Sequence, residues 1–167
     1  MAAPDIPNFA KRRERLRGLI RRQGGEAMLV TNFTNVSYLT GFTGDDSYLL
    51  LGKEQELLIS DPRYQQQIEE ECPSLASFIR KPNELLVDVT VRQIRQWGLP
   101  QLTCEAQSLS VHTFDQLQSQ LPDVTFEKGD GLVEWLRMIK DKHELVILRR
   151  AVAIAERVFT IIRAQLT

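Results

Sequence analysis

NVSYLTGFTGDDSYLLL, residues 35–51, places a turn with two glycines and two acids between an aromatic-rich segment and an apolar run. SYLLLG and the later ELLIS flank a short polar loop, which predicts a β-hairpin. Gly41 and Gly44 indicate a positive φ angle or close packing of the backbone in the turn. Asp45 and Asp46 suit an Asx turn that enters the first strand, and the alternative is a carboxylate pair for acid–base catalysis.

Helices and strands alternate on both sides of this hairpin. Apolar spacing predicts the helices, with Asn8 as the first N-cap and the Thr34-Asn35 pair as the second. The expected helices cover residues 8–23, 36–40, 61–72, 85–97 and 110–121. The expected strands cover residues 27–31, 47–52, 56–60, 77–81, 102–106 and 124–128. This order predicts an α/β fold in which a mixed sheet of about six strands has helices on both faces, followed by a long C-terminal helix.

Residues 11–22, KRRERLRGLIRR, concentrate positive charge on the first expected helix. The segment holds seven basic residues and one acid, a net charge of +6, so the remainder sums to −7 given the total of −1. We expect the basic side chains to lie mostly on the solvent face of an amphipathic helix. A nucleic-acid surface is the alternative, and we expect no nucleic-acid partner because no aromatic stacking platform accompanies the basic residues.

The composition is that of a globular protein. The chain has 167 residues, of which 43% are hydrophobic and 26% charged, and this is enough to bury a core. Cys72 and Cys104 stand in unrelated contexts and are expected to be reduced thiols. His112 and His143 lack partners at a metal-binding spacing. No secretory signal and no membrane-length apolar run is present, so we expect a cytoplasmic location and no membrane partner.

The character of the sequence changes near Gly129-Asp130. Residues 131–167 have a helical pattern, so we expect one domain over residues 1–130 and a second segment over residues 131–167. Residues 144–166 carry two apolar stripes. The first stripe comprises Leu145, Leu148, Val152, Ala155, Phe159, Ile162 and Leu166, and the second comprises Ile147, Ala151, Ile154, Val158 and Ile161. We expect the second stripe to lack cover within the chain and to join two copies in a homodimer.

A polar group follows the strand ELLIS directly. Asp61, Arg63 and Tyr64 place an acid, a guanidinium and a phenol at the carboxyl end of this strand, where open α/β sheets bind ligands. A structural interpretation is equally open, in which Asp61 caps the following helix and Arg63 pairs with a nearby carboxylate.

Three segments in this order resemble a known family. They are RRERLRGLIRRQGGEAMLVTNFTNVSYLTGFTGDDSYLLL, then ELLISDPRYQQQ, then LRMIKDKHELVILRRAVAIAE. They are similar to the creatinase/prolidase N-terminal domain and the opening helix of the pita-bread catalytic domain of Xaa-Pro aminopeptidases. The resemblance implies a ribonuclease-H-like fold up to about residue 130, without nuclease chemistry. Two positions depart from the family pattern: residues 44–47 are Gly-Asp-Asp-Ser where Gly-Ser-x-Gly is usual, and residues 25–26 are Gly-Glu.

The resemblance also implies a function. Family members hydrolyse Xaa-Pro bonds in proline-containing peptides with a water that bridges two metal ions, Mn, Co or Zn, held by two Asp, one His and two Glu of the catalytic domain. We expect this chain to end at the first helix of that domain, so no catalytic or metal-binding residue is carried over and the segment alone is expected to be inactive. The expected substrate-rim residues are Arg63, Tyr64, Asp61, Phe42, Asp45 and Asp46. A non-catalytic module that binds peptides or proteins is the alternative, and prolidase, aminopeptidase P and creatinase-like substrates all remain open.

Overall fold

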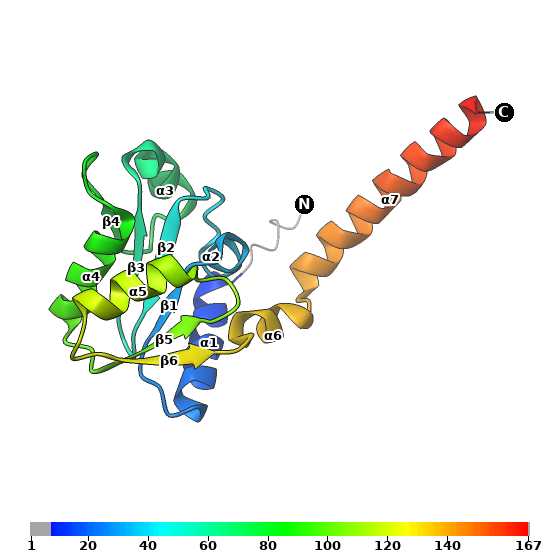
Figure 1. Ribbon diagram of the computed structural model, residues 1–167. Helices are drawn as coiled ribbons and strands as arrows, with labels where there is room; N and C mark the ends of the chain where they lie inside the picture. The colour runs from blue at the N-terminus through cyan, green and yellow to red at the C-terminus, as the bar shows by residue number, and fades with distance from the viewer. Residues whose placement is uncertain (1–7, 167) are drawn as a thin grey trace.

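The computed structural model describes residues 8–166, which contain a six-stranded mixed sheet (Figure 1). The strand order is β4-β3-β2-β1-β5-β6. The strands are β1 (Met28–Val30), β2 (Ser47–Leu51), β3 (Glu56–Ser60), β4 (Ser77–Ile79), β5 (Gln101–Glu105) and β6 (Thr125–Gly129). β1 and β3 each pair antiparallel with β2, whereas the β3–β4, β1–β5 and β5–β6 pairs are parallel. The predicted hairpin is therefore β2–β3, and the predicted mixed sheet is confirmed.

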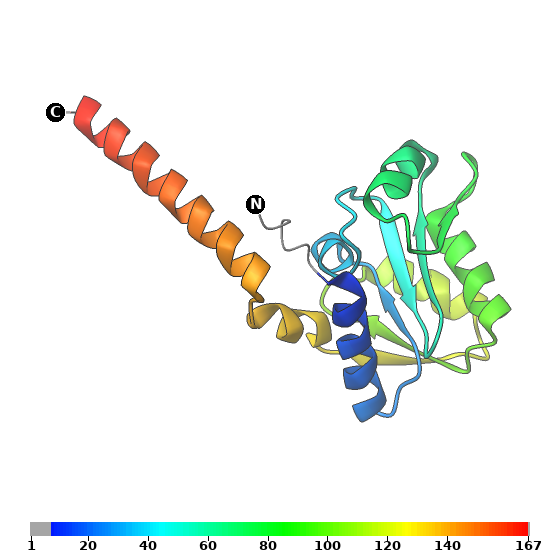
Figure 2. The same ribbon diagram turned by 180° about the vertical axis from the view of Figure 1, so that it is seen from behind.

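Helices cover both faces of the sheet, as predicted (Figures 1 and 2). They are α1 (Phe9–Arg22), α2 (Phe33–Thr40), the 3-10 helix η1 (Pro62–Tyr64), α3 (Gln65–Glu71), α4 (Leu86–Trp97), α5 (Val111–Gln120), α6 (Leu132–Met138) and α7 (Lys142–Gln165). Side chains from α1, α2, α3 and α6 form one buried apolar cluster with the sheet, and side chains from α4 and α5 form a second cluster on the opposite face. Two cores therefore lie on either side of one sheet.

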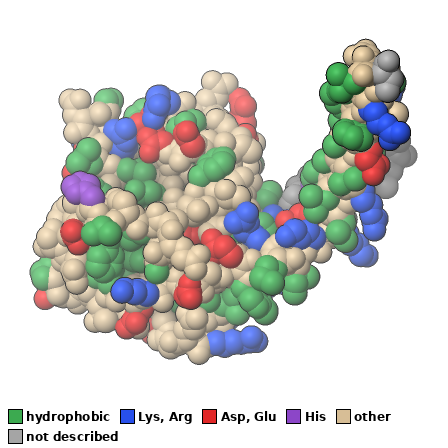
Figure 3. Space-filling model, turned by 45° about the vertical axis from the view of Figure 1, so that its right-hand side comes forward, with side chains coloured by type: hydrophobic (Ala, Val, Ile, Leu, Met, Phe, Trp, Pro, Cys, Tyr) green, Lys and Arg blue, Asp and Glu red, His purple; other side chains and the backbone are tan. Residues whose placement is uncertain are grey.

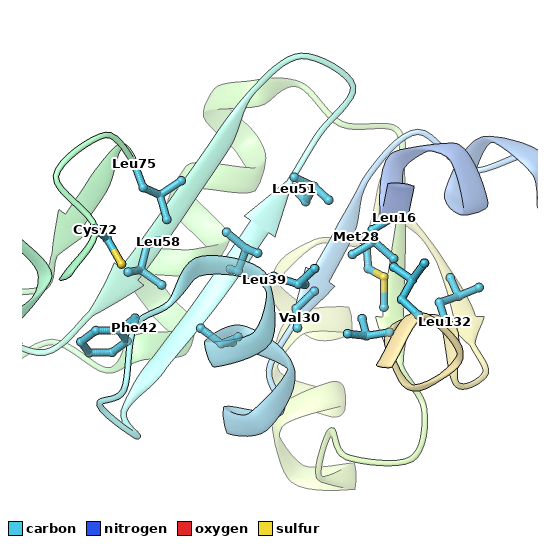
Figure 4. Close-up of a cluster of buried hydrophobic side chains, with 14 of the residues drawn as sticks. Leu16, Met28, Val30, Leu39, Phe42, Leu51, Leu58, Cys72, Leu75 and Leu132 are labelled. Carbon is cyan, nitrogen blue, oxygen red and sulfur yellow. The ribbon is translucent and has the colours of Figure 1, made fainter. Parts of the chain in front are cut away.

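The strands divide their side chains between the two clusters by alternation. Met28 and Val30 of β1 face the first cluster and Leu29 faces the second, and all three are buried. This is the period-two pattern of a strand that is covered on both faces. Figure 4 shows the first cluster, in which Phe42 lies at one end and Leu132 of α6 at the other. The turn at residues 41–46 is thus connected to the core through Phe42.

Two helix starts differ from the prediction. α2 begins at Phe33 because Asn32, rather than Thr34 or Asn35, is its N-cap: the Asn32 side chain accepts hydrogen bonds from the backbone N of Thr34 (3.0 Å) and Asn35 (3.2 Å). The segment after Asp61 is not one helix from residue 61 to 72. It begins as the 3-10 helix η1 and continues as α3, which ends at Glu71.

The basic residues of α1 are less exposed than expected. Arg12 and Arg13 are buried, and the Arg13 guanidinium forms two hydrogen bonds of 2.8 Å to the carboxylate of Glu56 on β3. Arg17 also pairs with Glu56, at 2.9 Å. The prediction that these side chains lie mostly on the solvent face is therefore wrong for Arg12, Arg13 and Arg17, of which Arg13 and Arg17 reach the hairpin. A buried guanidinium requires a partner of this kind, and the partner lies outside the local sequence.

The last two helices differ in their surroundings. Leu132, Val133 and Leu136 of α6 are buried in the first cluster, and α6 ends at Met138. α7 is a separate helix of 24 residues that starts with Asp141 in a capping box and has no buried residue. The two segments are helical, as predicted, but the expected boundary near Gly129-Asp130 stays a prediction. Within residues 8–166, no helix combines the length and apolarity needed to cross a bilayer.

Candidate functional site

The turn at residues 41–46 is fastened to α3. The backbone N and the hydroxyl of Thr43 each donate a hydrogen bond of 2.7 Å to the carboxylate of Glu71. Gln67 donates a hydrogen bond to the same hydroxyl at 2.8 Å. The turn therefore has a fixed position over the start of β2, although its residues are polar and partly exposed.

Gly44 allows two aromatic rings to meet beneath the turn. Phe42 and Tyr64 pack edge to face, with 5.6 Å between ring centroids and an interplanar angle of 84°. A Cβ atom on Gly44 would lie 2.3 Å from Cζ of Phe42 and 2.8 Å from Cδ1 of Tyr64. Gly41 has a φ of +86° and ends α2. Gly41 thus supplies a left-handed backbone and Gly44 supplies space, and the sequence indicated both needs.

Arg63 connects the turn to the carboxyl end of β3. Its Nη2 atom lies 2.9 Å from a carboxylate oxygen of Asp46, and its Nε atom lies 2.7 Å from Asp61. The Tyr64 hydroxyl donates a short hydrogen bond to Asp45. Five of the six predicted rim residues therefore form two hydrogen-bonded sets, Asp46–Arg63–Asp61 and Asp45–Tyr64, which meet where the Arg63 guanidinium lies 5.4 Å from the centroid of the Tyr64 ring. The sixth residue, Phe42, packs against Tyr64. The side chains of Asp45 and Asp46 accept hydrogen bonds from Tyr64 and Arg63, which follow β3. The Asx-turn interpretation did not include these bonds.

Asp61 is the buried anchor of this group. Its side chain is 5% exposed and accepts hydrogen bonds from the backbone N and from Nε of Arg63, so it caps η1. Arg80, at the end of β4, donates to its other oxygen. The hydrogen bonds from Arg63 and the charge of Arg80 lower the pKa of Asp61 below its ordinary value. The structural interpretation of Asp61 and Arg63 is thus confirmed, while ligand binding stays a prediction.

Arg63 retains capacity for a further partner. Its side chain is 67% exposed, and among the residues that the structure describes its Nη1 group has no hydrogen-bond partner. The hydrogen bond to Asp61 raises the pKa of Arg63, so the guanidinium stays charged at any physiological pH. Asp46 and Asp61 hold the Arg63 guanidinium in place. Its Nη1 edge is therefore positively charged, fixed in position and exposed to solvent. A carboxylate is the group that such an edge binds best.

The sequence analysis did not predict a second polar network, which is centred on Glu105 and Asn35. Glu105, buried at the end of β5, accepts hydrogen bonds from the backbone N of Thr31 (2.6 Å) and Asn32 (2.7 Å) and from Nδ2 of Asn35 (2.6 Å). The same Nδ2 donates to Glu134 of α6 at 2.5 Å, and Arg137 donates to the Asn35 side-chain oxygen at 2.9 Å. The network joins β1, α2, β5 and α6. A carboxylate directly after an apolar strand, in LTCE, was the signal that could have indicated it.

The carboxylates of this domain do not form a metal site. Within residues 8–166, no three His, Cys, Asp or Glu side chains converge as metal ligands. Asp61 and Asp46 are already paired with arginine, and Asp45 accepts from Tyr64. The donor set present here does not fit a two-metal centre, so no chemical step through a metal is assigned to this domain.

Known proteins share this fold and part of this sequence. The family model of the creatinase/prolidase N-terminal domain matches residues 12–139. The uncharacterized peptidase YqhT of Bacillus subtilis (strain 168) is 30% identical over 146 residues, which are 87% of this chain and 41% of that protein. A Xaa-Pro dipeptidase from Bacillus anthracis aligns with a TM-score of 0.88 and 29% identity over 94% of this chain and 43% of its own. The N-terminal domain of the cytoplasmic peptidase PepQ from Mycobacterium tuberculosis H37Rv aligns with a TM-score of 0.69 and 28% identity, over 75% of this chain and 98% of its own.

The sheet order and the two-sided helical cover define an α/β domain that is similar to the N-terminal domains of solved peptidases. The chain belongs to the creatinase/prolidase N-terminal domain family. It spans about two fifths of the length of the curated relatives that it matches. The predicted family and fold are therefore confirmed, and relatives with this domain are described as peptidases.

Proposed function

We propose that this chain is the N-terminal, substrate-rim domain of a metal-dependent Xaa-Pro aminopeptidase or dipeptidase. The observation that carries the proposal is the group formed by Asp46, Asp61 and Arg63, in which a fixed and exposed guanidinium lies at the carboxyl end of β3. Likeness to a Xaa-Pro dipeptidase over 94% of the chain supports the substrate class. The domain would supply binding and orientation, and hydrolysis would take place in a catalytic domain.

Arg63 can act in two ways. Its free Nη1 edge can bind the carboxylate of a proline-containing peptide, or it can hold a loop of a neighbouring subunit at the rim of the catalytic pocket. In either case Asp46 and Asp61 restrict its rotamers before the ligand arrives, which lowers the entropy lost on binding. Tyr64 and Phe42 support the arrangement from below, and Gly44 makes their contact possible.

Several parts of the proposal rest on the family resemblance. These are the dependence on two divalent ions, Mn, Co or Zn, the preference for bonds that precede proline, a homodimeric assembly and a cytoplasmic location. The ions would be bound outside the residues described here, because the donors in this domain do not converge. The residues of this domain would position the substrate and exclude competing orientations.

The proposal is tested by assaying Ala-Pro hydrolysis with the complete polypeptide that contains this domain and with the 167-residue chain. We expect activity in the complete polypeptide that is lost with EDTA and restored by Mn²⁺, and none in the 167-residue chain. A complete polypeptide that binds Xaa-Pro peptides with no hydrolysis under any metal would instead identify a binding module.

A pair of substrates distinguishes the two roles of Arg63. Carboxylate binding predicts that the complete polypeptide prefers Ala-Pro to its C-terminal amide by about tenfold in kcat/KM, the effect of one charge-assisted hydrogen bond. Arg63→Ala should remove this preference. If Arg63→Ala lowers kcat/KM for both substrates by the same factor, Arg63 holds a loop and does not contact the carboxylate.

A further inference from the structure

Helix α2 joins the candidate rim to the end of α6. Its last residue, Thr40, is followed by Gly41 and then by Phe42, which anchors the turn in the first cluster. The Tyr38 hydroxyl of α2 donates a hydrogen bond of 3.3 Å to the backbone O of Leu136, near the end of α6. One short helix therefore contacts both the turn that carries the rim residues and the segment that leads into α7.

Arg12 of α1 connects α2 to the first turn of α7. Its guanidinium donates a hydrogen bond of 2.9 Å to the backbone O of Tyr38 and lies 4.1 Å from the centroid of the Tyr38 ring. Its Nη2 atom lies 2.6 Å from Asp141 and 3.3 Å from Glu144, the two residues of the α7 capping box. Figure 3 shows basic and acidic side chains gathered where α7 leaves the body. The Arg12 side chain is only 8% exposed, so salt and water screen these contacts little.

Helix α6 is bonded to α2 through side chains as well. Nδ2 of Asn35 donates to Glu134 at 2.5 Å, and Arg137 donates to the side-chain oxygen of Asn35 at 2.9 Å. Lys140, between the two helices, donates to the backbone O of Arg137 at 2.6 Å. The connection between α6 and α7 comprises residues 139–141 and is thus held on both sides by contacts with the body. These contacts predict a rigid joint, because flexible segments have few such bonds.

We propose that Arg12 and Tyr38 are positioning residues that set the direction of α7, and of the catalytic domain that α7 would open, relative to the rim that carries Arg63. The part that concerns the catalytic domain rests on the proposed function, whereas the direction of α7 is a property of this chain. The likeness to the Bacillus anthracis dipeptidase covers 94% of this chain and so includes most of α7, which supports the direction described here. A displacement of about 1 Å between a binding group and the reacting atoms can lower a rate by about a hundredfold.

Arg13 gives a matched comparison on the same helix. Arg12 and Arg13 are 7% and 6% exposed. Each donates a hydrogen bond of 2.9 Å from Nη1 to a backbone O of α2, which belongs to Tyr38 in one case and to Leu39 in the other. Arg13 pairs with Glu56 of the hairpin, at 2.8 Å, where Arg12 pairs with α7. Variants of both residues therefore lose a buried charge and a bond to α2, and only variants of Arg12 alter the joint.

Double electron–electron resonance on the 167-residue chain measures the direction of α7. Spin labels at Gln118→Cys on α5 and Ala153→Cys on α7, both exposed positions, report a distance between the body and the helix. The native cysteines are buried, and dilution with unlabelled chain removes distances between copies. The wild type and Arg13→Gln should give one narrow distribution at the same distance. Arg12→Gln should shift and broaden it.

A second variant tests the joint from the side of α7. Asp141→Asn combined with Glu144→Gln removes both carboxylates that face Arg12 and retains residues that form a capping box. Neither position lies in the two buried clusters, so the variant should fold. It should shift and broaden the distribution as Arg12→Gln does. An unchanged distribution in this variant, a broad distribution in the wild type, or equal broadening by Arg13→Gln and Arg12→Gln would each overturn the proposal.

Kinetics of the complete polypeptide test the consequence for the rim. Arg12→Gln should lower kcat/KM for Ala-Pro by about tenfold, while Arg13→Gln should leave it unchanged. In an Arg63→Ala background, Arg12→Gln should have no further effect, because it acts through the position of Arg63. Equal losses in both backgrounds would contradict positioning of the rim. A complete polypeptide that does not hydrolyse Ala-Pro would contradict the proposed function, and the spin-label distances would then decide this inference by themselves.

Discussion

The turn at residues 41–46 and helix α7 are opposite cases of how a segment obtains its structure. In the turn, Phe42 is fully buried, and Thr43, Asp45 and Asp46 each bond to a side chain that follows β3. α7 has a complete N-terminal capping box and good helical spacing but no buried residue. The turn is therefore specified by tertiary contacts within the domain, whereas α7 is specified by local signals and is not buried by the rest of the described residues.

The largest expected effect is on the turn. Gly44→Ala should lower the free energy of unfolding by about 3 kcal/mol, because the added Cβ meets the rings of Phe42 and Tyr64. Gly18→Ala on α1 is the control, since no atom lies within 4 Å of its Cβ position. It should stabilise the chain by about 0.5–1 kcal/mol, as expected for alanine within a helix. Urea denaturation measures both, and a Gly44→Ala variant as stable as Gly18→Ala would contradict the packing described here.

A smaller effect is expected at the base of α7. Arg12→Ala should cost about 2 kcal/mol, because the carboxylates of Asp141 and Glu144 lose their buried partner and the Tyr38 ring loses its cation. Arg15→Ala, an exposed position on the same helix, should change stability by less than about 0.5 kcal/mol. Equal losses in the two variants would show that the Arg12 contacts do not hold α7.

The turn should also respond to acid. The pKa of Asp61 is lowered by the hydrogen bond from Arg63, and that of Asp45 by the hydrogen bond from Tyr64, both from an ordinary value of 3.8. The unfolded chain binds protons more readily at these groups, so their stabilisation is complete above the unfolded pKa and is lost as the pH falls below it. Stability measured from pH 6 to pH 2 should therefore decrease below about pH 4. The Asp61→Asn variant should be less stable than the wild type at pH 6, and its free energy of unfolding should decrease less as the pH falls. A pH curve parallel to that of the wild type would refute the contribution of Asp61.

The smallest effect is expected on α7 itself. Ile154→Glu lies on the second stripe at a residue that is 56% exposed, so it should change the stability of the folded body by less than about 0.5 kcal/mol. Leu49→Glu, at a fully buried position of β2, is the contrasting control and should prevent folding. Thermal unfolding followed by circular dichroism separates the two. A large loss for Ile154→Glu would mean that α7 is covered by the body.

Sequence patterns predicted what depends on neighbouring residues. The hairpin, the Asn8 cap, the two-faced burial of β1 and the left-handed Gly41 follow from spacing and residue type within a few positions. The six expected rim residues lie in two short segments, 42–46 and 61–64, which the structure brings together at one end of the sheet. Their place at a substrate rim stays a prediction.

Contacts between distant residues were not predictable in the same way. Arg13 and Glu56 are 43 residues apart, Asn35 and Glu105 are 70 apart, and Arg12 and Asp141 are 129 apart. A basic helix has the same sequence pattern whether its arginines face solvent or a buried carboxylate. The choice between the two depends on the register of the hairpin and on the position of α7, which only the folded chain defines.

The central claim is that Arg63 serves activity more than it serves the fold. Its direct test compares Arg63→Ala with Arg92→Ala, an exposed arginine whose ion pair with Glu84 has the same length of 2.9 Å as the Arg63–Asp46 pair. Both should lower the melting temperature of the 167-residue chain by no more than about 2 °C, because in Arg63→Ala the Asp61 carboxylate keeps its hydrogen bonds from Arg80 and from the backbone N of residue 63. In the complete polypeptide, Arg63→Ala should lower kcat/KM for Ala-Pro by at least about tenfold, while Arg92→Ala should not change it. A fall of several degrees in the melting temperature of Arg63→Ala, with kcat/KM unchanged, would contradict the account.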